Sequence, residues 1–310
     1  MRLPSSLLRS SILRVSDHPW FRRLAGSRLG RRVASRFVAG ETLADAMTAA
    51  RELRAAGIDA MLDHLGENVE SPDQALVARA AYLSALDSLA AEPGLGGAIS
   101  IKLTQLGLDD SIDDCWANLV PILDLAEANG TLVMIDMESH AYVDDTLEIL
   151  RRAAERGSSA GVALQAYLRR SERDVFNLPP GIRVRLVKGA YLEHPDVAFA
   201  TKREVDASFA RLFSTLLTHG HPIDVATHDP SLVEGVRKRV DDMPKGWSRV
   251  EFQMLYGVRR DQQSRLAGQG YPVRVYVPYG TEWYPYLTRR LAERPANLWF
   301  FLSNLLRFSR

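Results

Sequence analysis

Eight short apolar segments alternate with longer amphipathic segments along most of the chain. The apolar segments are near-continuous runs of Val, Ile, Leu and Ala, a pattern typical of parallel strands that are covered on both faces of a sheet. We therefore predict strands at residues 58–62, 98–103, 131–136, 161–166, 182–187, 223–226, 250–255 and 273–277.

The segments between these strands repeat apolar residues at helical spacing, as in 71–91, 111–129 and 140–156. Gly130 and Gly157 come just after two of them, where a left-handed C-terminal cap is favoured. Ahead of the first strand, Thr42 is placed to cap a helix that ends before Gly57. Eight strand–helix units predict an α/β fold, a (βα)8 TIM-type barrel with extra N-terminal helices. We expect a helical lead-in over residues 1–55 and one barrel over residues 56–310, including a C-terminal helix.

Composition narrows the classes of function. A formal net charge of +1 over 310 residues gives no reason to expect a nucleic-acid partner. Cys115 is the only cysteine, so the sequence has no intramolecular disulfide and no multi-cysteine metal site. No apolar run approaches the ~20 residues of a membrane span. We expect a reducing, cytoplasmic setting.

The first 36 residues are rich in Arg and Ser, and Asp17 is their only acidic residue. That composition resembles a transit peptide. A basic helical lead-in to the barrel is the interpretation we favour, and mitochondrial targeting stays open as the alternative.

Polar side chains gather where the predicted strands end. In TIM-type barrels the chemistry lies at the carboxyl ends of the strands and in the loops that follow. Burying charged groups within apolar runs is costly without partners, so their recurrence at this end of the barrel predicts a site. These residues are Asp63, His64, Lys102, Thr104, Asp136, Glu138, Gln165, Arg185, Lys188, Thr227, His228, Asp229 and Tyr276.

Several of these residues favour an anionic ligand. Lys102 and Arg185 bring positive charge, and the Lys188-Gly189-Ala190 segment offers backbone N–H groups at a place of close approach. Contacts of this kind suit a cofactor phosphate, and Gln165 and Arg185 suit a polarised heterocycle. No G-x-G-x-x-G motif follows a strand, so a Rossmann nicotinamide site is not expected.

A metal site is the competing interpretation for the acidic residues. Asp136, Glu138 and His228 are residue types that ligate metals, but the basic residues predicted beside them would repel a cation. We expect no metal.

The segment after the last predicted strand continues into an aromatic-rich helix, with Thr281 as its expected N-cap. Tyr286, Arg289, Arg290 and Glu293 fall close to one face of that helix. Two guanidinium groups beneath an aromatic ring suit a small carboxylate that is bound bidentately.

Taken together, these motifs resemble the proline dehydrogenase family, flavin-dependent enzymes that oxidise L-proline to Δ1-pyrroline-5-carboxylate. The resemblance covers residues 43 to 293, and the chain resembles the single-function form because no aldehyde-dehydrogenase domain follows. The matching segments are ISIKL at 99–103, IDME at 135–138, LQAYL at 164–168, VRLVKGAY at 184–191, ATH at 226–228, MLYG at 254–257, YVPYG at 276–280 and YLTRR at 286–290.

The resemblance implies a role for each matching position. It implies that Asp136 and Arg185 are the catalytic positions. The implied substrate residues are Lys102, Leu255, Tyr276, Tyr286, Arg289 and Arg290, with the two arginines binding the proline carboxylate. The implied flavin contacts are Met137, Gln165, Arg185, Val187, Lys188, Gly189, Ala190, Thr227 and His228.

Two positions depart from the family pattern. Leu192 stands where bifunctional relatives carry a tryptophan, and Arg294-Pro295 replaces the Asn that often follows the Glu. The first departure concerns the dinucleotide end of the cofactor, so FAD is the expected cofactor and FMN stays open.

The implied reaction transfers a hydride from C5 of proline to flavin N5. In this interpretation Asp136 aligns Tyr276 or the nearby cations, and no role as proton acceptor is assigned to it. The resemblance also implies that electrons pass to a quinone, which requires peripheral contact with the inner face of a membrane. The apolar residues Leu298, Phe301, Leu302, Leu305 and Phe308 recur at helical spacing and suit either that contact or packing on the barrel, which we favour.

Two other functions compete with this interpretation. One is a Schiff-base lyase in which Lys188 or Lys102, with its pKa lowered by neighbouring cations, attacks a carbonyl substrate. The other is a barrel that serves only as a binding module. A flavin spectrum in the purified protein would eliminate both.

Overall fold

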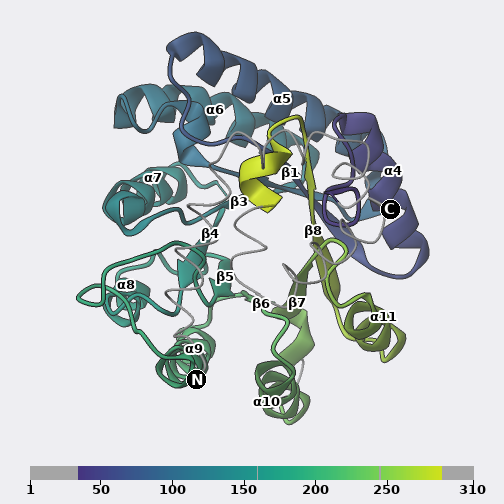
Figure 1. The fold of residues 1–310 in the computed structure, drawn as a ribbon, viewed down its shortest axis with the longest axis vertical. Coiled ribbons are helices and arrows are strands. Elements are labelled where there is room, and N and C mark those ends of the chain that lie inside the picture. The colour runs from purple at the N-terminus through teal and green to yellow at the C-terminus, as the bar shows by residue number, and fades with distance from the viewer. Residues whose placement is uncertain (1–33, 159, 244–245, 288–310) are drawn as a thin grey trace, which may run out of the picture.

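The protein is a closed barrel of eight parallel strands in sequential order, with β1 paired to β8 (Figure 1). The computed structural model describes residues 34–158, 160–243 and 246–287. The predicted TIM-type fold is confirmed. The strands are β1 Asp59–His64, β2 Ala98–Ile101, β3 Leu132–Ile135, β4 Gly161–Gln165, β5 Val184–Val187, β6 Ile223–Ala226, β7 Val250–Leu255 and β8 Val273–Tyr279.

Helices surround this ring of strands (Figure 1). None in the described part of the chain is long and apolar enough to cross a membrane. The α-helices are α4 Leu43–Ala55, α5 Pro72–Ala90, α6 Ile112–Asn129, α7 Val143–Glu155, α8 Ser171–Phe176, α9 Lys202–Thr218, α10 Pro230–Asp241 and α11 Arg260–Gly268. Short 3-10 helices are η1 Pro93–Leu95, η2 Leu103–Leu106, η3 His140–Tyr142 and η4 Gly246–Ser248.

Local sequence accounts for the ends of several helices. The Thr42 hydroxyl accepts a hydrogen bond from the Asp45 N–H, and the Asp45 carboxylate accepts one from the Thr42 N–H, so α4 begins with a capping box. Ser71 and Ser111 cap α5 and α6 with their hydroxyl groups. Gly130 ends α6 in the left-handed conformation, as predicted.

The hydrophobic core lies between the strands and the surrounding helices. Tyr82 of α5, Phe209 of α9 and Phe252 of β7 are among its largest fully buried side chains. Burying a side chain of this size contributes about 1.5–3 kcal/mol. The core therefore holds the strands, and the polar residues at their ends, in a fixed ring.

Some strand ends differ from the prediction. The chain leaves β2 after Ile101 and forms η2 from Leu103, so Lys102 lies at the junction of strand and loop instead of within a strand. Strand β8 continues through Tyr279, because Ala39 donates a backbone hydrogen bond to the Pro278 carbonyl and the neighbouring strand β1 pairs along its full length. The predicted turn at 278–280 was therefore too early.

Residues 34–40 contact the end of β8. Gly280 donates a backbone hydrogen bond of 3.0 Å to the Gly40 carbonyl. Residues 283–287 are helical, so Glu282 precedes the first helical residue and Thr281 is not the N-cap. Tyr286 in this helix packs against Val38 and Leu65 at the carboxyl-end rim of the barrel.

Candidate active site

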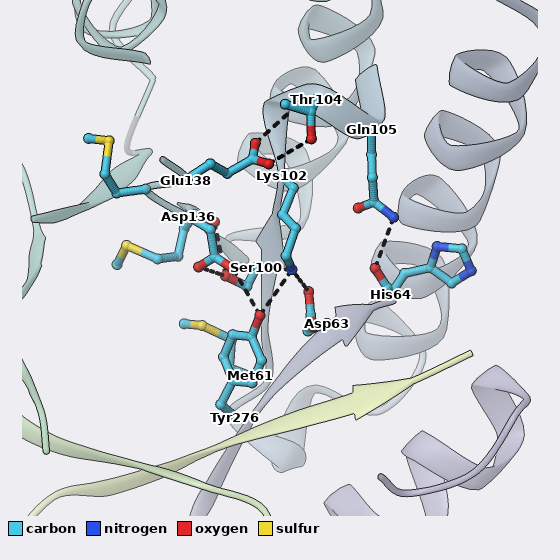
Figure 2. Close-up of polar contacts among 12 residues, drawn as sticks. Met61, Asp63, His64, Ser100, Lys102, Thr104, Gln105, Asp136, Glu138 and Tyr276 are labelled. Atoms are coloured by element: carbon cyan, nitrogen blue, oxygen red, sulfur yellow. Dashed lines mark hydrogen bonds and ion pairs between the residues drawn. The ribbon is translucent and has the colours of Figure 1, made fainter. Parts of the chain in front are cut away.

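Strands β1, β2, β3 and β8 bring four polar side chains together at their carboxyl ends (Figure 2). The Lys102 ammonium donates a hydrogen bond to Asp63 Oδ1 at 2.7 Å and another to the Tyr276 hydroxyl oxygen at 3.2 Å. It also lies 3.3 Å from Asp136 Oδ2. The Tyr276 hydroxyl donates to Asp136 Oδ2 at 2.8 Å. The four groups therefore form one closed polar cluster.

Electrostatics keep Lys102 charged. Burial on its own lowers the pKa of Lys102, but Asp63, Tyr276 and Asp136 outweigh burial and raise that pKa well above its usual value. This corrects the premise of the lyase alternative for Lys102, which needed a lowered pKa. The neighbours that decide the outcome are acids, which the sequence pattern did not place beside this lysine.

Asp136 is held as a carboxylate. Burial raises the pKa of Asp136, but the cations of Lys102 and Arg185 outweigh burial and lower that pKa below its usual value. Besides Tyr276, its donors are the Ser100 hydroxyl at 2.7 Å and Arg185 Nη1 at 2.5 Å. These contacts suit a group that orients its neighbours.

Arg185 lies across the floor of the same cluster and is 4% exposed. Its Nη1 donates to Ser100 Oγ at 3.0 Å as well as to Asp136, and its Nε donates to Gln253 Oε1 at 2.8 Å. The guanidinium carbon lies 5.3 Å from the centre of the Tyr276 ring. The plane of the Arg185 guanidinium is therefore fixed by contacts on two of its sides.

One cavity of about 1150 Å³ collects the predicted site residues. Arg289 and Arg290 lie outside the described residues, and every other residue to which the resemblance assigns a role lines this cavity, whereas Asp63, His64, Thr104 and Glu138 do not. The residues with an assigned role that line it are Lys102, Asp136, Met137, Gln165, Arg185, Val187, Lys188, Gly189, Ala190, Thr227, His228, Leu255, Tyr276 and Tyr286.

Gln165 presents an unused acceptor to this cavity. Its amide nitrogen donates to the backbone carbonyls of Met137 at 2.8 Å and Glu138 at 2.7 Å, which fixes the amide orientation. The remaining oxygen, Oε1, is buried and accepts no hydrogen bond from any residue that the structure describes. A buried carbonyl without a donor is costly, so it suits a ligand with an N–H group. The isoalloxazine ring of a flavin carries such a group, and Gln165 therefore fits a flavin.

Gly189 fixes the shape of the cavity beside β5. Its φ of 119° is accessible to glycine, and a Cβ there would lie 2.2 Å from Cδ1 of the Tyr167 ring. The Tyr167 N–H donates to the Lys188 carbonyl at 2.8 Å, which holds the two loops together. No other residue can replace Gly189 unless the Tyr167 ring moves.

Charge at the far end of the cavity is more balanced than the sequence indicated. The Lys188 ammonium lies 2.5 Å from Asp206 Oδ1 and 2.8 Å from Asp229 Oδ2. Lys202 also contacts Asp229, at 2.8 Å. Burial raises the pKa of Asp229, but the hydrogen bonds from Lys188 and Lys202 outweigh burial and lower it. The expected excess of positive charge is therefore partly neutralised by acids from α9 and the start of α10.

His228 is hydrogen-bonded to the last residue of β7. Its Nε2 accepts a hydrogen bond from the Leu255 N–H at 3.0 Å, so Nε2 carries no proton in this arrangement. Thr227 Oγ1 accepts a hydrogen bond from the Asp229 N–H at 3.2 Å. Thr227 and His228, two of the implied flavin contacts, thus line the cavity and are also bound within the protein.

Three residues of the site were not assigned from the sequence. Asp63 was noted at a strand end and Ser100 within the matching segment 99–103, both without a role, and Gln253 was not noted. Ser100 shares the alternation of β2 with Lys102, two residues on, and that spacing is the signal that would have found it. Among the described residues, no group of three or more His, Cys, Asp and Glu side chains is arranged to hold a metal ion.

Fold and site together define a TIM-barrel enzyme with a buried polar cluster at one end of a large cavity. A family model described as proline dehydrogenase matches residues 46–301. Proline dehydrogenase 1 of Bacillus subtilis (strain 168) is 40% identical over 290 residues, covering 93% of this chain and 94% of the relative. The proline dehydrogenase of Deinococcus radiodurans is 39% identical and covers 97% of this chain and 98% of the relative. The chain therefore belongs to the proline dehydrogenase family, whose members are flavin-dependent oxidoreductases.

A solved structure gives the same fold. The crystal structure of proline utilization A from Bdellovibrio bacteriovorus, inactivated by N-propargylglycine, superposes with a TM-score of 0.77 at 25% identity. The match covers 85% of this chain and 32% of that chain. The chain thus corresponds to about a third of that larger protein.

Proposed function

We propose that the protein oxidises L-proline to Δ1-pyrroline-5-carboxylate. The observation that carries this proposal is the cluster of Lys102, Asp136, Arg185 and Tyr276 at one end of the cavity. A bound flavin would supply the redox chemistry, accepting at N5 the hydride that leaves C5 of proline. Family membership supports the substrate, and the cluster supports a site with fixed charges.

The cofactor we propose is FAD, with FMN as the alternative. Met137, Gln165, Val187, Lys188, Gly189, Ala190, Thr227 and His228 would hold it, together with Arg185. The cavity of about 1150 Å³ is also lined by Phe199 and Lys202, which supports a ligand larger than a mononucleotide.

In the proposed substrate site, Arg289 and Arg290 bind the proline carboxylate beside Lys102. A forked pair of guanidinium groups fixes both the position and the angle of a carboxylate. Tyr276, Tyr286 and Leu255 would enclose the ring; Tyr286 is 6% exposed and packed against Val38 and Leu65 at the rim.

The protein side of the mechanism is orientation and charge. Lys102 stays protonated and Arg185 brings a second cation. Each is held in place by a carboxylate, so both offer positive charge to a bound ligand at a fixed position. Asp136 is already bound by Tyr276, Ser100 and Arg185, so in our proposal it orients Tyr276 and accepts no proton from the substrate.

We further propose that electrons pass to a quinone, with the protein in the cytoplasm and in peripheral contact with the inner face of a membrane. Mitochondrial targeting is the alternative for the location. The apolar run at 298–308 lies outside the described residues, as does most of the 1–55 lead-in. Flotation with anionic liposomes tests the contact, and proline-dependent reduction of a soluble quinone tests the acceptor.

A single preparation tests the reaction itself. The purified protein should be yellow, release FAD on denaturation, and lose its flavin absorbance when L-proline is added without oxygen. D-proline is the control, because it carries its carboxylate on the opposite side of the ring. A colourless protein, or a flavin that L-proline does not reduce, would overturn the proposal.

A further inference from the structure

A chain of hydrogen bonds runs from Arg185, beside the polar cluster of Lys102, Asp136 and Tyr276, down the inside of the barrel. Arg185 Nε donates to Gln253 Oε1 at 2.8 Å, and Gln253 Nε2 donates to Glu251 Oε1 at 2.8 Å. Glu251 Oε1 in turn accepts from Arg274 Nε at 2.8 Å. Arg274 Nη1 donates to the backbone carbonyls of Gly96 at 2.6 Å and Ala60 at 3.1 Å. The chain therefore ends on the main chain at the amino end of the barrel.

The orientation of Gln253 follows from its two neighbours. A carboxylate accepts hydrogen bonds only, so the Gln253 NH2 group must face Glu251 and its oxygen must face Arg185. The reverse orientation would point NH2 at a guanidinium and oxygen at a carboxylate, which leaves both contacts repulsive. Gln253 is 4% exposed, so water cannot repair such a mismatch.

Arg185 needs this acceptor to hold its plane. Its Nη1 is bound by Asp136 and Ser100, while its Nη2 contacts the Met61 sulfur, a weak acceptor. Nη1 and Nε lie on different sides of the guanidinium group, so two acceptors there fix both rotation and tilt. Without Gln253, only the Asp136 side of the group would be firmly held.

We propose that Gln253 is a positioning residue for the reaction, one that fixes Arg185 against the flavin, with Glu251 setting the orientation of its amide. This rests on the proposed function, in which Arg185 faces the flavin. Gln253 also lines the cavity in which we propose that the flavin binds.

The test compares Gln253→Met with Gln262→Met. Methionine keeps the approximate volume and removes the hydrogen bonds. Gln262 is a matched control because it is 1% exposed and neither of its amide atoms bonds to any described residue. Arg185→Met and the double variant Gln253→Met with Arg185→Met complete a cycle.

Three measurements are needed. One is the midpoint potential of the bound flavin, and the second is kcat/KM for proline. The third requires no flavin: the exchange of the Arg185 Nε–H proton in spectra of protein labelled with ¹⁵N-arginine, assigned by its loss in Arg185→Met. Glu251→Gln is a second variant, which disturbs the amide without altering a group that contacts Arg185.

We expect Gln253→Met to speed exchange of the Arg185 Nε–H, to lower the midpoint potential and to reduce kcat/KM by roughly tenfold or more, since one hydrogen bond to a charged group is lost. Glu251→Gln should change the exchange rate, the midpoint potential and kcat/KM in the same directions, with smaller effects than Gln253→Met. Gln262→Met should match the parent. In the Arg185→Met background, adding Gln253→Met should change the potential little further.

Unchanged exchange and potential in both Gln253→Met and Glu251→Gln would overturn the inference, as would full additivity with Arg185→Met. Should Gln253→Met not fold, Glu251→Gln decides alone by the same criteria. A parent protein whose flavin is not reduced by proline would instead contradict the proposed function. The exchange measurement separates the two failures.

Discussion

The Tyr276 hydroxyl donates a hydrogen bond of 2.8 Å to Asp136 Oδ2, joining β8 to the end of β3 across the barrel. The same hydroxyl oxygen accepts a hydrogen bond from Lys102 at 3.2 Å. Because Asp136 is an acceptor and Lys102 a donor, the direction of the phenolic O–H is determined. Burial and Asp136 both raise the pKa of Tyr276 well above its usual value, so the phenol stays protonated.

Removing this hydroxyl should impair catalysis and spare the cofactor. Tyr276→Phe keeps the ring and leaves Asp136 and Lys102 each without one partner. We expect kcat/KM for proline to fall by about 10- to 100-fold, corresponding to roughly 1.5–3 kcal/mol, with unchanged flavin content. Tyr271→Phe is the matched control, because its hydroxyl donates to Asp241 outside the cavity. Equal effects of the two variants would refute a role for the Tyr276 hydroxyl.

Arg185→Met should act on the cofactor. The variant removes the cation on the cavity floor, so negative charge on a reduced flavin is less well stabilised. The midpoint potential should fall below that of the parent, as measured by redox titration with a reference dye. A constant potential together with a collapse of proline affinity would mean that Arg185 serves the substrate instead.

Arg289→Met and Arg290→Met should act on the substrate. Each leaves the carboxylate with one partner, which costs on the order of 2–4 kcal/mol in kcat/KM. We expect the apparent KM for proline to rise in each variant while flavin content stays at the parental level. Parental kinetics in both variants would exclude the pair as the carboxylate site.

Trapping with borohydride should detect no lysine adduct. The pKa of Lys102 is raised, so its free amine is scarce at neutral pH, and the Lys188 ammonium is bound by Asp206 and Asp229. Incubation with pyruvate and borohydride, followed by intact mass measurement, should leave the mass unchanged. A mass increase that disappears in Lys102→Met or Lys188→Met would revive the lyase.

Glu138→Gln should change how stability depends on pH. Burial raises the pKa of Glu138 to about 7 from its usual 4.5, despite hydrogen bonds from Thr104 that oppose the shift. The folded state thus binds this proton more tightly than the unfolded state, and the parent loses stability as pH rises from about 4.5 to 7.

The glutamine variant has no such proton. Its free energy of unfolding relative to the parent should therefore increase across this window, by on the order of 3 kcal/mol in total, and level off above about pH 7. Urea unfolding at several pH values measures the difference. A difference that stays constant with pH would show that Glu138 keeps an ordinary pKa.

The barrel was predictable because its strands are nearly all apolar and its helices are amphipathic, so the alternation is visible residue by residue. The strand ends were harder to place. Lys102 lies outside β2 because the 3-10 helix η2 begins at the next residue, Leu103. Nothing in the local composition indicates that helix. Strand β8 runs on to Tyr279 because β1 and residues 34–40 pair with it, which is a property of the tertiary fold.

The site was predicted by residue type and position but not by pairing. Lys188 was expected to face an anion, yet it contacts Asp206. This residue lies in the second turn of the amphipathic helix α9 and looks like an ordinary surface acid in the sequence. In the sequence, Asp63 likewise looks like an ordinary acid at the end of a strand. In the structure its Oδ1 lies 2.7 Å from Lys102 Nζ. Such contacts depend on which strands become neighbours, and the sequence gives no direct sign of them.

The pairing of β1 with β8 has a consequence for how the protein is made. Six residue pairs join the first strand, Asp59–His64, to the last strand, from Arg274 to Tyr279. The first strand emerges from the ribosome long before the last strand has been synthesised. One edge of β1 therefore stays unpaired while more than 200 further residues are translated. The cavity wall at Tyr276 does not exist until then. Flavin should consequently bind only after β8 has been synthesised and has paired with β1, and nascent chains that stall before β8 should be targets for chaperones.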